Sequence, residues 1–252
     1  MGSRVLLGVV LIATLTTLTI AQRRKGAVAT SSAAGQSGAT PIAMDADPCF
    51  HPELQNGTVK IFRVQVAAHA STSPDIHQHD YIVLSLGNSA FKVKSEFNSR
   101  SVQMAAGEMQ VFKGGWAERL INTSDAPLDL VELEVEGGID PEHPECGLAA
   151  AECRDGEFGD GFTSSTLFET PKIKVGRVDL DPNGVLPKHT HIQSHVLVAL
   201  ADMRLSDQET GKDAENLQLK VGEVAWHEGP EEHMLTNVGD KDAPIIVVEF
   251  KE

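Results

Sequence analysis

Short runs of apolar and β-branched residues, interrupted by Gly, Asn and Asp, follow one another along the chain from residue 58 onward. In the first half these runs cover residues 59–66, 81–86, 91–97, 109–112 and 128–135. In the second half they cover residues 173–180, 196–205, 217–221, 223–226 and 245–250. None has the sustained 3.6-residue period of a long amphipathic helix. Many short strands separated by turn residues predict an all-β fold, with a sandwich or small barrel in each half.

The two halves repeat each other at a nearly constant spacing. Three pairs of positions carry identical residues in the same order: Gly107 and Gly222, Asn122 and Asn237, and Glu132 and Glu249. The first two pairs are 115 residues apart and the third is 117 apart, which implies a two-residue insertion between them. Ordered pairs of this kind indicate an internal duplication. We therefore expect one unit over residues 51–137, a second over 172–252, and an irregular connector over 138–171.

The N-terminal 21 residues have a basic residue, Arg4, followed by an apolar run over residues 5–20. This order is typical of a secretory signal peptide, here with cleavage before Gln22, so we expect a secreted or periplasmic protein. An uncleaved membrane anchor is the alternative, because the basic residues 23–25 directly after the run are unusual for easy export. Residues 22–50, mostly small and polar, are expected to form a flexible linker.

The charge of the chain restricts its partners. It has 36 acidic residues against 21 Lys and Arg, a formal net charge of −15. This excess argues against nucleic acid, and against a membrane surface as partner beyond the signal segment. A small anionic molecule remains compatible, because a divalent cation would dominate the field inside its own pocket. We expect a small-molecule ligand or substrate, and a homodimer stays open.

The three cysteines are Cys49, Cys146 and Cys153. In an exported protein two of them are expected to oxidise and one to be left over. Cys146 and Cys153 flank a short loop and are the expected pair, although a bridge from Cys49 to either one stays open. None has a histidine beside it at a metal-ligand spacing, so we do not expect a catalytic thiol.

The histidines of the second half are the main candidates for chemistry. His189, His191 and His195 share one parity, so on extended backbone their side chains point to the same face. A second strand carrying His233 could bring a fourth imidazole to that face. Neutral imidazole binds Zn, Fe, Cu, Ni and Mn. We therefore predict that these four histidines hold one divalent transition metal, whose identity the sequence leaves open.

These residues resemble the two motifs of the cupin family. The first is H-x-H followed after three or four residues by E, and the second is G-x5-P-x-G-x2-H-x3-N. The second half of the chain has the matching residues His189, His191, His195, Gly222, His233 and Asn237. It departs from the family in having His195 where Glu is usual, and Gly229-Pro230 in place of P-x-G. Asn237 is expected to stabilise a turn rather than to bind metal.

The first half resembles the same motifs more weakly. Its matching residues are His77, His79, Gly107, Gly115 and Asn122, with Val83 at the carboxylate position and Glu118 at the second-motif histidine. The resemblance implies two tandem cupin-type jelly-roll β-barrels, of which the first has a degenerate site. His77, His79 and Glu118 could still form a two-His-one-carboxylate site of the kind that binds non-haem iron. The alternative is a barrel in which they only hydrogen-bond to one another and to water.

The predicted ligand set points to Lewis-acid chemistry. Four neutral imidazoles leave the full charge of the cation available to an oxygen ligand. A six-coordinate metal would keep two open positions, whereas four-coordinate zinc would be closed and structural. Two functions follow: a metal-dependent, dioxygenase-like oxidoreductase acting on a small oxygen-rich molecule, or a non-catalytic small-ligand, metal-binding or structural protein. The sequence assigns no catalytic residue; one of four residues of the second-motif segment could reach the pocket mouth: His227, Glu228, Glu231 or Glu232.

Overall fold

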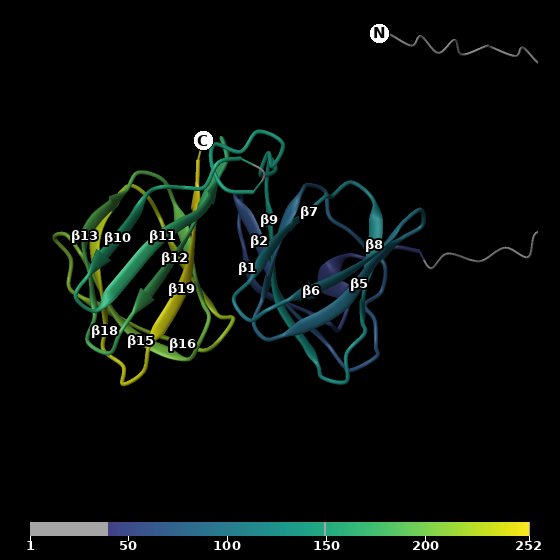
Figure 1. Cartoon of the computed structure of the whole chain (residues 1–252), viewed down its shortest axis with the longest axis horizontal. Coiled ribbons are helices and arrows are strands. Elements are labelled where there is room, and N and C mark those ends of the chain that lie inside the picture. Colours follow the sequence, from purple (N-terminus) through teal and green to yellow (C-terminus); the bar gives the residue numbers. More distant parts are fainter. Residues whose placement is uncertain (1–39, 149, 252) are drawn as a thin grey trace, which may run out of the picture. The chain divides into compact units, whose positions relative to one another are not determined.

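The computed structural model describes residues 40–148 and 150–251, which form two units built of antiparallel strands (Figure 1). The helix of this part of the chain is a single 3-10 turn, η1 (Met44–Ala46). Within the same residues there is no helix long and apolar enough to span a membrane. The predicted signal peptide and most of the predicted linker lie outside the described residues.

The first unit is a jelly-roll of two packed sheets. Its strands are β1 (Phe50–Gln55), β2 (Val59–Val66), β3 (Asp75–Ile76), β4 (Tyr81–Ser85), β5 (Ser89–Ser95), β6 (Ser99–Met104), β7 (Met109–Phe112), β8 (Ala117–Asn122) and β9 (Leu128–Val135). One sheet has the order β1-β2-β9-β4-β7 and the other β3-β8-β5-β6. Apolar side chains from both sheets, among them Phe62, Phe91 and Phe112, fill the interior.

The second unit repeats this topology strand for strand. Its strands are β10 (Gly156–Gly159), β11 (Phe162–Glu169), β12 (Ile173–Leu180), β13 (Val185–His191), β14 (His195–Ala199), β15 (Met203–Glu209), β16 (Glu215–Leu219), β17 (Val224–His227), β18 (Glu231–Asn237) and β19 (Ala243–Phe250). The sheet orders are β10-β11-β12-β19-β14-β17 and β13-β18-β15-β16, so each strand of the first unit has a counterpart and β10 is added at one edge. The predicted all-β fold of two tandem jelly-roll barrels is confirmed.

The segment expected to be an irregular connector is partly ordered sheet. Strands β10 and β11 lie within residues 138–171 and pair with each other and with β12. Strand β11 has buried phenylalanines near its ends, Phe162 and Phe168, with a Ser/Thr-rich stretch between them. That stretch gives no apolar alternation for a sequence pattern to detect, and its backbone pairing with β12 forms the strand.

Strand register corrects the predicted insertion between the halves. Val59 pairs with Val135 in the first unit and Ile173 pairs with Phe250 in the second, so Glu249 corresponds to Glu134 rather than to Glu132. The spacing of 115 therefore holds on β9 and β19 as well. The two-residue insertion was wrong because identical residues were aligned without knowledge of which strand positions pair.

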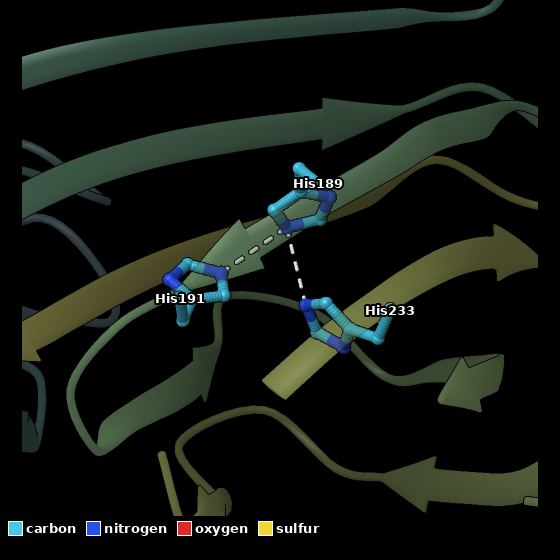
Figure 2. Close-up of side chains that lie close together, drawn as sticks. All are labelled: His189, His191 and His233. Carbon is cyan, nitrogen blue, oxygen red and sulfur yellow. Dashed lines mark hydrogen bonds between the residues drawn. The ribbon is translucent and has the colours of Figure 1, made fainter. Parts of the chain in front are cut away.

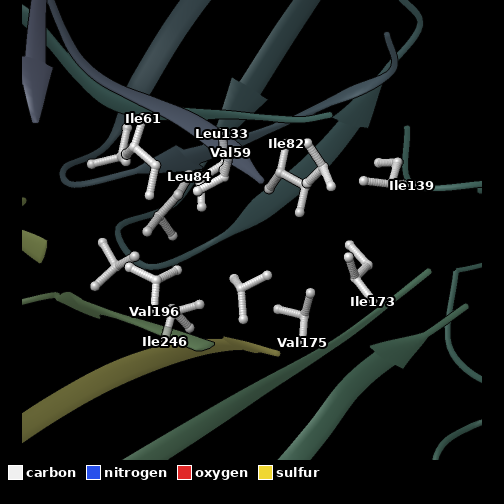
Figure 3. Packing of buried hydrophobic residues seen from close by; sticks show 14 of the residues in the cluster. Val59, Ile61, Ile82, Leu84, Leu133, Ile139, Ile173, Val175, Val196 and Ile246 are labelled. Carbon is white, nitrogen blue, oxygen red and sulfur yellow. The ribbon is translucent and has the colours of Figure 1, made fainter. Parts of the chain in front are cut away.

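The two units share a hydrophobic core, here called the inter-barrel core. It consists mainly of Val59, Ile61, Ile82, Leu84, Val131, Leu133, Ile139, Ile173, Val175, Val196, Val198, Ile246 and Val248 (Figure 3). Strand β4 shows how it forms: Ile82 points into this core, whereas Val83 points into the interior of the first barrel. Both faces of β4 and of its counterpart β14 are thus buried, which explains their uninterrupted apolar sequences.

One arginine, Arg63, reinforces the contact between the units. Arg63 on β2 donates to the backbone oxygen of Val221 at 2.6 Å, and Asp129 holds its guanidinium through two hydrogen bonds of 2.9 and 2.7 Å. A β-carbon at Gly222, where φ is +83°, would lie 3.2 Å from Arg63 Nη1. Glycine at position 222 therefore allows both the positive φ and the close approach of the Arg63 side chain.

The buried asparagines at the ends of β8 and β18 have the same role in both units. Asn237 Nδ2 donates to the backbone oxygens of Leu180, Asp181 and Lys241 at 2.7–3.1 Å. Asn122 makes the equivalent three hydrogen bonds in the first unit. The expectation that Asn237 stabilises a turn is confirmed.

The cysteines are arranged as expected. Cys146 and Cys153 form a disulfide with a Cα–Cα distance of 5.0 Å, and Cys49 is the free cysteine of the described residues. Burial, together with the nearby Asp47 carboxylate, raises the pKa of the Cys49 thiol to about 11. Because the thiolate is the reactive form, Cys49 is a poor nucleophile at neutral pH.

Candidate metal centre

Three of the four predicted histidines converge inside the second barrel. His189 and His191 lie on β13, and His233 lies on the adjacent strand β18, where it pairs directly with His189. Figure 2 shows the three rings pointing toward one another. His189 Nε2 is 3.1 Å from His191 Nε2 and 3.1 Å from His233 Nε2. The alternation of side chains along β13 and the cross-strand pair together produce this cluster, which we call the outer triad.

The other nitrogen of each ring is held by an acceptor. The Nδ1 partners are the backbone oxygen of Pro187 for His189 (2.8 Å), Glu249 Oε2 for His191 (3.1 Å) and Asp207 Oδ1 for His233 (2.9 Å). Carbonyl and carboxylate oxygens accept a hydrogen bond from Nδ1–H, so each neutral ring carries its proton on Nδ1 and a lone pair on Nε2. Histidines that bind metals are usually oriented in this way.

A bound cation fits the outer triad. Burial, assisted by the neighbouring imidazoles, lowers the pKa of His189 to about 4, so this ring is neutral at pH 7. The Nε2 lone pair of His189 faces those of His191 and His233 at 3.1 Å each, and facing lone pairs cannot hydrogen-bond without a proton between them. Two imidazole nitrogens bound to one cation at about 2.1 Å and at right angles would lie roughly 3.0 Å apart. The observed spacing is therefore that of neighbouring ligands on a shared metal ion.

The structure does not bring His195 into the outer triad. Residues 192–194 interrupt the strand, and His195 begins β14 in the other sheet. Its ring stacks on that of His191 with centroids 3.8 Å apart, and its Nε2 lies 3.5 Å from Glu231 Oε1. Burial, assisted by the surrounding imidazoles, lowers the pKa of His195 to about 2, so the ring is neutral.

Further donor groups lie beside the triad. Donor atoms lie within 4.8 Å of one another in three groups of described residues: His189, His191 and His233; His195, Glu231 and His233; and Asp207, His227 and His233. His227 and Glu231 are two of the four residues that the sequence offered for the pocket mouth; Glu228 and Glu232 are in none of these groups. Asp207 was not a candidate, since one aspartate on a strand carries no signal in the sequence. Glu249 was noticed only as part of the repeat, and its hydrogen bond from His191 lowers its pKa.

A cavity of about 330 Å³ adjoins the outer triad. Its walls are formed by apolar side chains such as Val178, Leu197 and Leu235, and by polar residues of β10 and β11. Lys174 also lines it and forms an ion pair with Asp155 at 2.6 Å. Strands β10 and β11, which lie in the segment expected to be an irregular connector, thus contribute one wall of the cavity.

The candidate residues of the first barrel are arranged differently. His77 is buried and lies 3.0 Å from Glu132 Oε2 and 3.4 Å from Asp75 Oδ1, while its ring stacks on Tyr81. Burial opposes a charge on His77, but its contacts with Glu132 and Asp75 outweigh this effect and raise its pKa. Burial and the nearby Glu132 raise the pKa of Asp75 to about 8. Glu132 gives His77 Nε2 a charged partner without a metal, whereas His77 Nδ1 has no hydrogen-bond partner.

The other two residues of the predicted second site do not complete a cluster with His77. Glu118 accepts hydrogen bonds from Tyr81 and Trp116, whereas the half-exposed His79 lies near Glu134, at 3.7 Å. The three residues are not among the converging groups of the described chain. The space around His77 and Glu118 has a cavity volume of about 0 Å³. The first barrel is therefore packed around His77, whereas Glu118 also lines a separate cavity of about 490 Å³ together with Phe112 and Trp116.

Register shows which positions of the two barrels correspond. Asp75 pairs with Glu118 as His189 pairs with His233. His77 is accordingly the counterpart of His191. The position of the second barrel that corresponds to His79 is not a candidate metal ligand. The H-x-H of the first half is thus displaced by two residues from the position that the resemblance suggested.

No model of a known protein family matches the sequence, and no curated protein matches it. Solved structures match the fold at low sequence identity. A cupin 2 conserved barrel domain protein from Leptotrichia buccalis is 12% identical, with a TM-score of 0.50, over 80% of this chain and 88% of that one. Oxalate decarboxylase from Bacillus subtilis, described with Mn(II) centres, is 10% identical, with a TM-score of 0.57, over 86% and 78%. Salicylate 1,2-dioxygenase from Pseudoaminobacter salicylatoxidans, described with gentisate adducts, is 9% identical, with a TM-score of 0.55, over 76% and 68%.

Proposed function

Because the chain has the two-unit cupin fold, we propose that its second barrel binds a divalent transition metal through His189, His191 and His233 and presents it to a small molecule in the adjoining cavity. The observation that supports this most directly is the convergence of three Nε2 lone pairs whose Nδ1 atoms are each held by an acceptor. Each ring is therefore oriented before any metal arrives, as expected for ligands fixed by their neighbours.

The donor set suits Fe, Mn, Ni, Cu or Zn. Three neutral ligands leave the dipositive charge uncompensated, so the cation supplies a Lewis acid, and a redox centre if it is iron, manganese or copper. The residues of the chain have separate tasks. Glu249 and Asp207 orient His191 and His233, and the apolar walls of the cavity exclude water from the ligand.

The cavity supports a small carboxylate or another oxygen-rich molecule as the ligand. A volume of about 330 Å³ is near the lower end for small-molecule sites. Lys174 supplies a cationic group at its wall, and an anionic ligand would compete with Asp155 for it. Two of the similar structures are an oxalate decarboxylase and a salicylate 1,2-dioxygenase. We therefore favour a metal-dependent oxidoreductase on a small carboxylate over a protein that only binds such a molecule.

The test is metal analysis followed by turnover. Protein purified without added metal is expected to contain a redox-active metal, and metal-loaded protein is expected to consume dioxygen or release carbon dioxide with one member of a panel of small carboxylates. Metal without turnover, together with saturable ligand binding, would support the non-catalytic alternative. Protein that takes up no metal at neutral pH would contradict the proposal.

We further propose that the protein is exported. The apolar run over residues 5–20 supports this, and so does the disulfide between Cys146 and Cys153, since such bridges persist in oxidising compartments. Mass measurement of the protein from its native host is expected to show a chain beginning near Gln22. An intact N-terminus in the membrane fraction would instead support the anchor.

A further inference from the structure

A second group of potential ligands lies behind the outer triad, on the side of His233 away from the cavity. This inner cluster consists of His195 on β14, Asp207 on β15, His227 on β17 and Glu231 on β18. None of the four lines the 330 Å³ cavity. Their donor atoms are close together: His227 Nδ1 is 3.1 Å from Glu231 Oε1 and 3.5 Å from Asp207 Oδ2, and His195 Nε2 is 3.5 Å from Glu231 Oε1.

The inner cluster holds buried polar atoms without partners. His195 is 0% exposed, yet neither of its ring nitrogens has a hydrogen-bond partner. Glu231 Oε1 and His227 Nε2 also lack one, although both side chains are largely buried. A buried polar atom that nothing satisfies keeps the full cost of its lost hydration. A bound ion would explain why several unpartnered buried polar atoms lie in one place.

The first barrel shows that the fold does not need polar groups at these positions. Register places Tyr81 opposite Phe112 as it places His195 opposite His227. By the same spacing, Val93 corresponds to Asp207 and Trp116 to Glu231. Tyr81 and Phe112 stack at 5.5 Å, and Val93 is buried in the same interior. The first barrel thus has aromatic and apolar side chains at the positions where the second has two imidazoles and two carboxylates.

We propose that the inner cluster is a second divalent-cation site, with Asp207, His227 and Glu231 as ligands and His195 completing the set. Two carboxylates balance the charge of a dipositive cation, so the ion would be neutralised where it is buried. Mixed imidazole and carboxylate donors suit zinc, manganese or iron(II). This site goes beyond the proposed function, which needs only the outer triad.

An ion in the inner cluster would join four strands, β14, β15, β17 and β18, beneath the outer triad and away from the small-molecule cavity. Asp207 contacts both sites, because its Oδ1 accepts from His233 Nδ1 at 2.9 Å while its Oδ2 faces His227. A cation on Oδ2 would fix this carboxylate and through it the orientation of His233. The inner ion is therefore structural, and it positions one ligand of the outer one.

The experiment counts metal ions. The full chain is stripped with a chelator, reloaded with Zn²⁺ or Mn²⁺ and measured by native mass spectrometry. We expect two ions per chain in the wild type and one in His227→Phe, a change to the residue that the first barrel carries at this position. His69→Phe, which replaces an exposed histidine of the first barrel, should keep two. His191→Ala should keep one, the inner ion.

The counts separate this inference from the proposed function. One ion in both the wild type and His227→Phe, and none in His191→Ala, would overturn the inner site and leave the outer one intact. No ion in the wild type would overturn both. If His227→Phe does not melt cooperatively, Glu231→Gln replaces it; this variant keeps the side-chain shape but removes the charge, and it should also bind one ion rather than two.

Discussion

Replacing His191 with alanine is expected to remove one metal ion per chain and to lower the affinity of the outer triad by at least about 100-fold, since even residues that only orient metal ligands contribute 10–100-fold. The change deletes one of three converging nitrogens and opens the site to water from the adjoining cavity. Metal content by mass spectrometry and affinity by competition with a chelator measure the loss. Any turnover that depends on the metal should disappear with it.

His77→Ala distinguishes the two barrels in the same assay. His77 is the counterpart of His191 in the first barrel, but it pairs with Glu132 and Asp75 in a space with no cavity. This variant should therefore keep its metal, although it should be less stable, because it leaves two buried carboxylates without their partner. If His77→Ala loses metal and His191→Ala does not, the metal binds in the first barrel and the assignment of the site is wrong.

Ile246→Ala is expected to destabilise both barrels together by about 2–5 kcal/mol, the usual effect of truncating a buried isoleucine. Ile246 is fully buried in the inter-barrel core and belongs to β19 of the second unit (Figure 3). Its side chain packs in a cluster to which both units contribute. The cavity left by the truncation should therefore weaken the first barrel as well as the second. Ile192→Ala is the matched control, since Ile192 is 70% exposed and its truncation should change stability little.

Each barrel carries its own fluorescent reporter for this measurement. Trp116 lies in the first unit and Trp226 in the second, so Trp116→Phe and Trp226→Phe variants report on one barrel at a time. Denaturant unfolding followed through the remaining tryptophan should give coincident transitions that shift together in Ile246→Ala. Two separate transitions, or a shift confined to the second barrel, would show that the barrels unfold independently.

The fold could be predicted from the sequence to a large extent because most strands are marked by local pattern. The predicted runs 59–66, 109–112, 128–135 and 173–180 have the observed bounds of β2, β7, β9 and β12. Strands without apolar alternation were missed, among them the exposed β6 and the Ser/Thr-rich β11. These strands form through backbone pairing with a neighbour, and that neighbour is not visible in their own sequence.

Only the part of the site that lies within one strand could be predicted from the sequence. The parity of His189 and His191 placed both on one face, and the strand ends directly after them. Three residues outside the strand separate His195 from His191; its ring still stacks on that of His191, but its Nε2 lies near Glu231. Asp207 and Glu249 enter the site from strands that are distant in sequence, so only strand register reveals them.

The inter-barrel core has a consequence for how the protein behaves on dilution. Two separate barrels held together by such a surface would dissociate at low concentration and expose β4 and β14. Here residues 138–155 connect them, so each barrel meets its partner at an effective concentration of roughly millimolar or above, whatever the amount of protein in solution. The second barrel would keep its partner even at extreme dilution, because the first barrel acts as a subunit that cannot diffuse away.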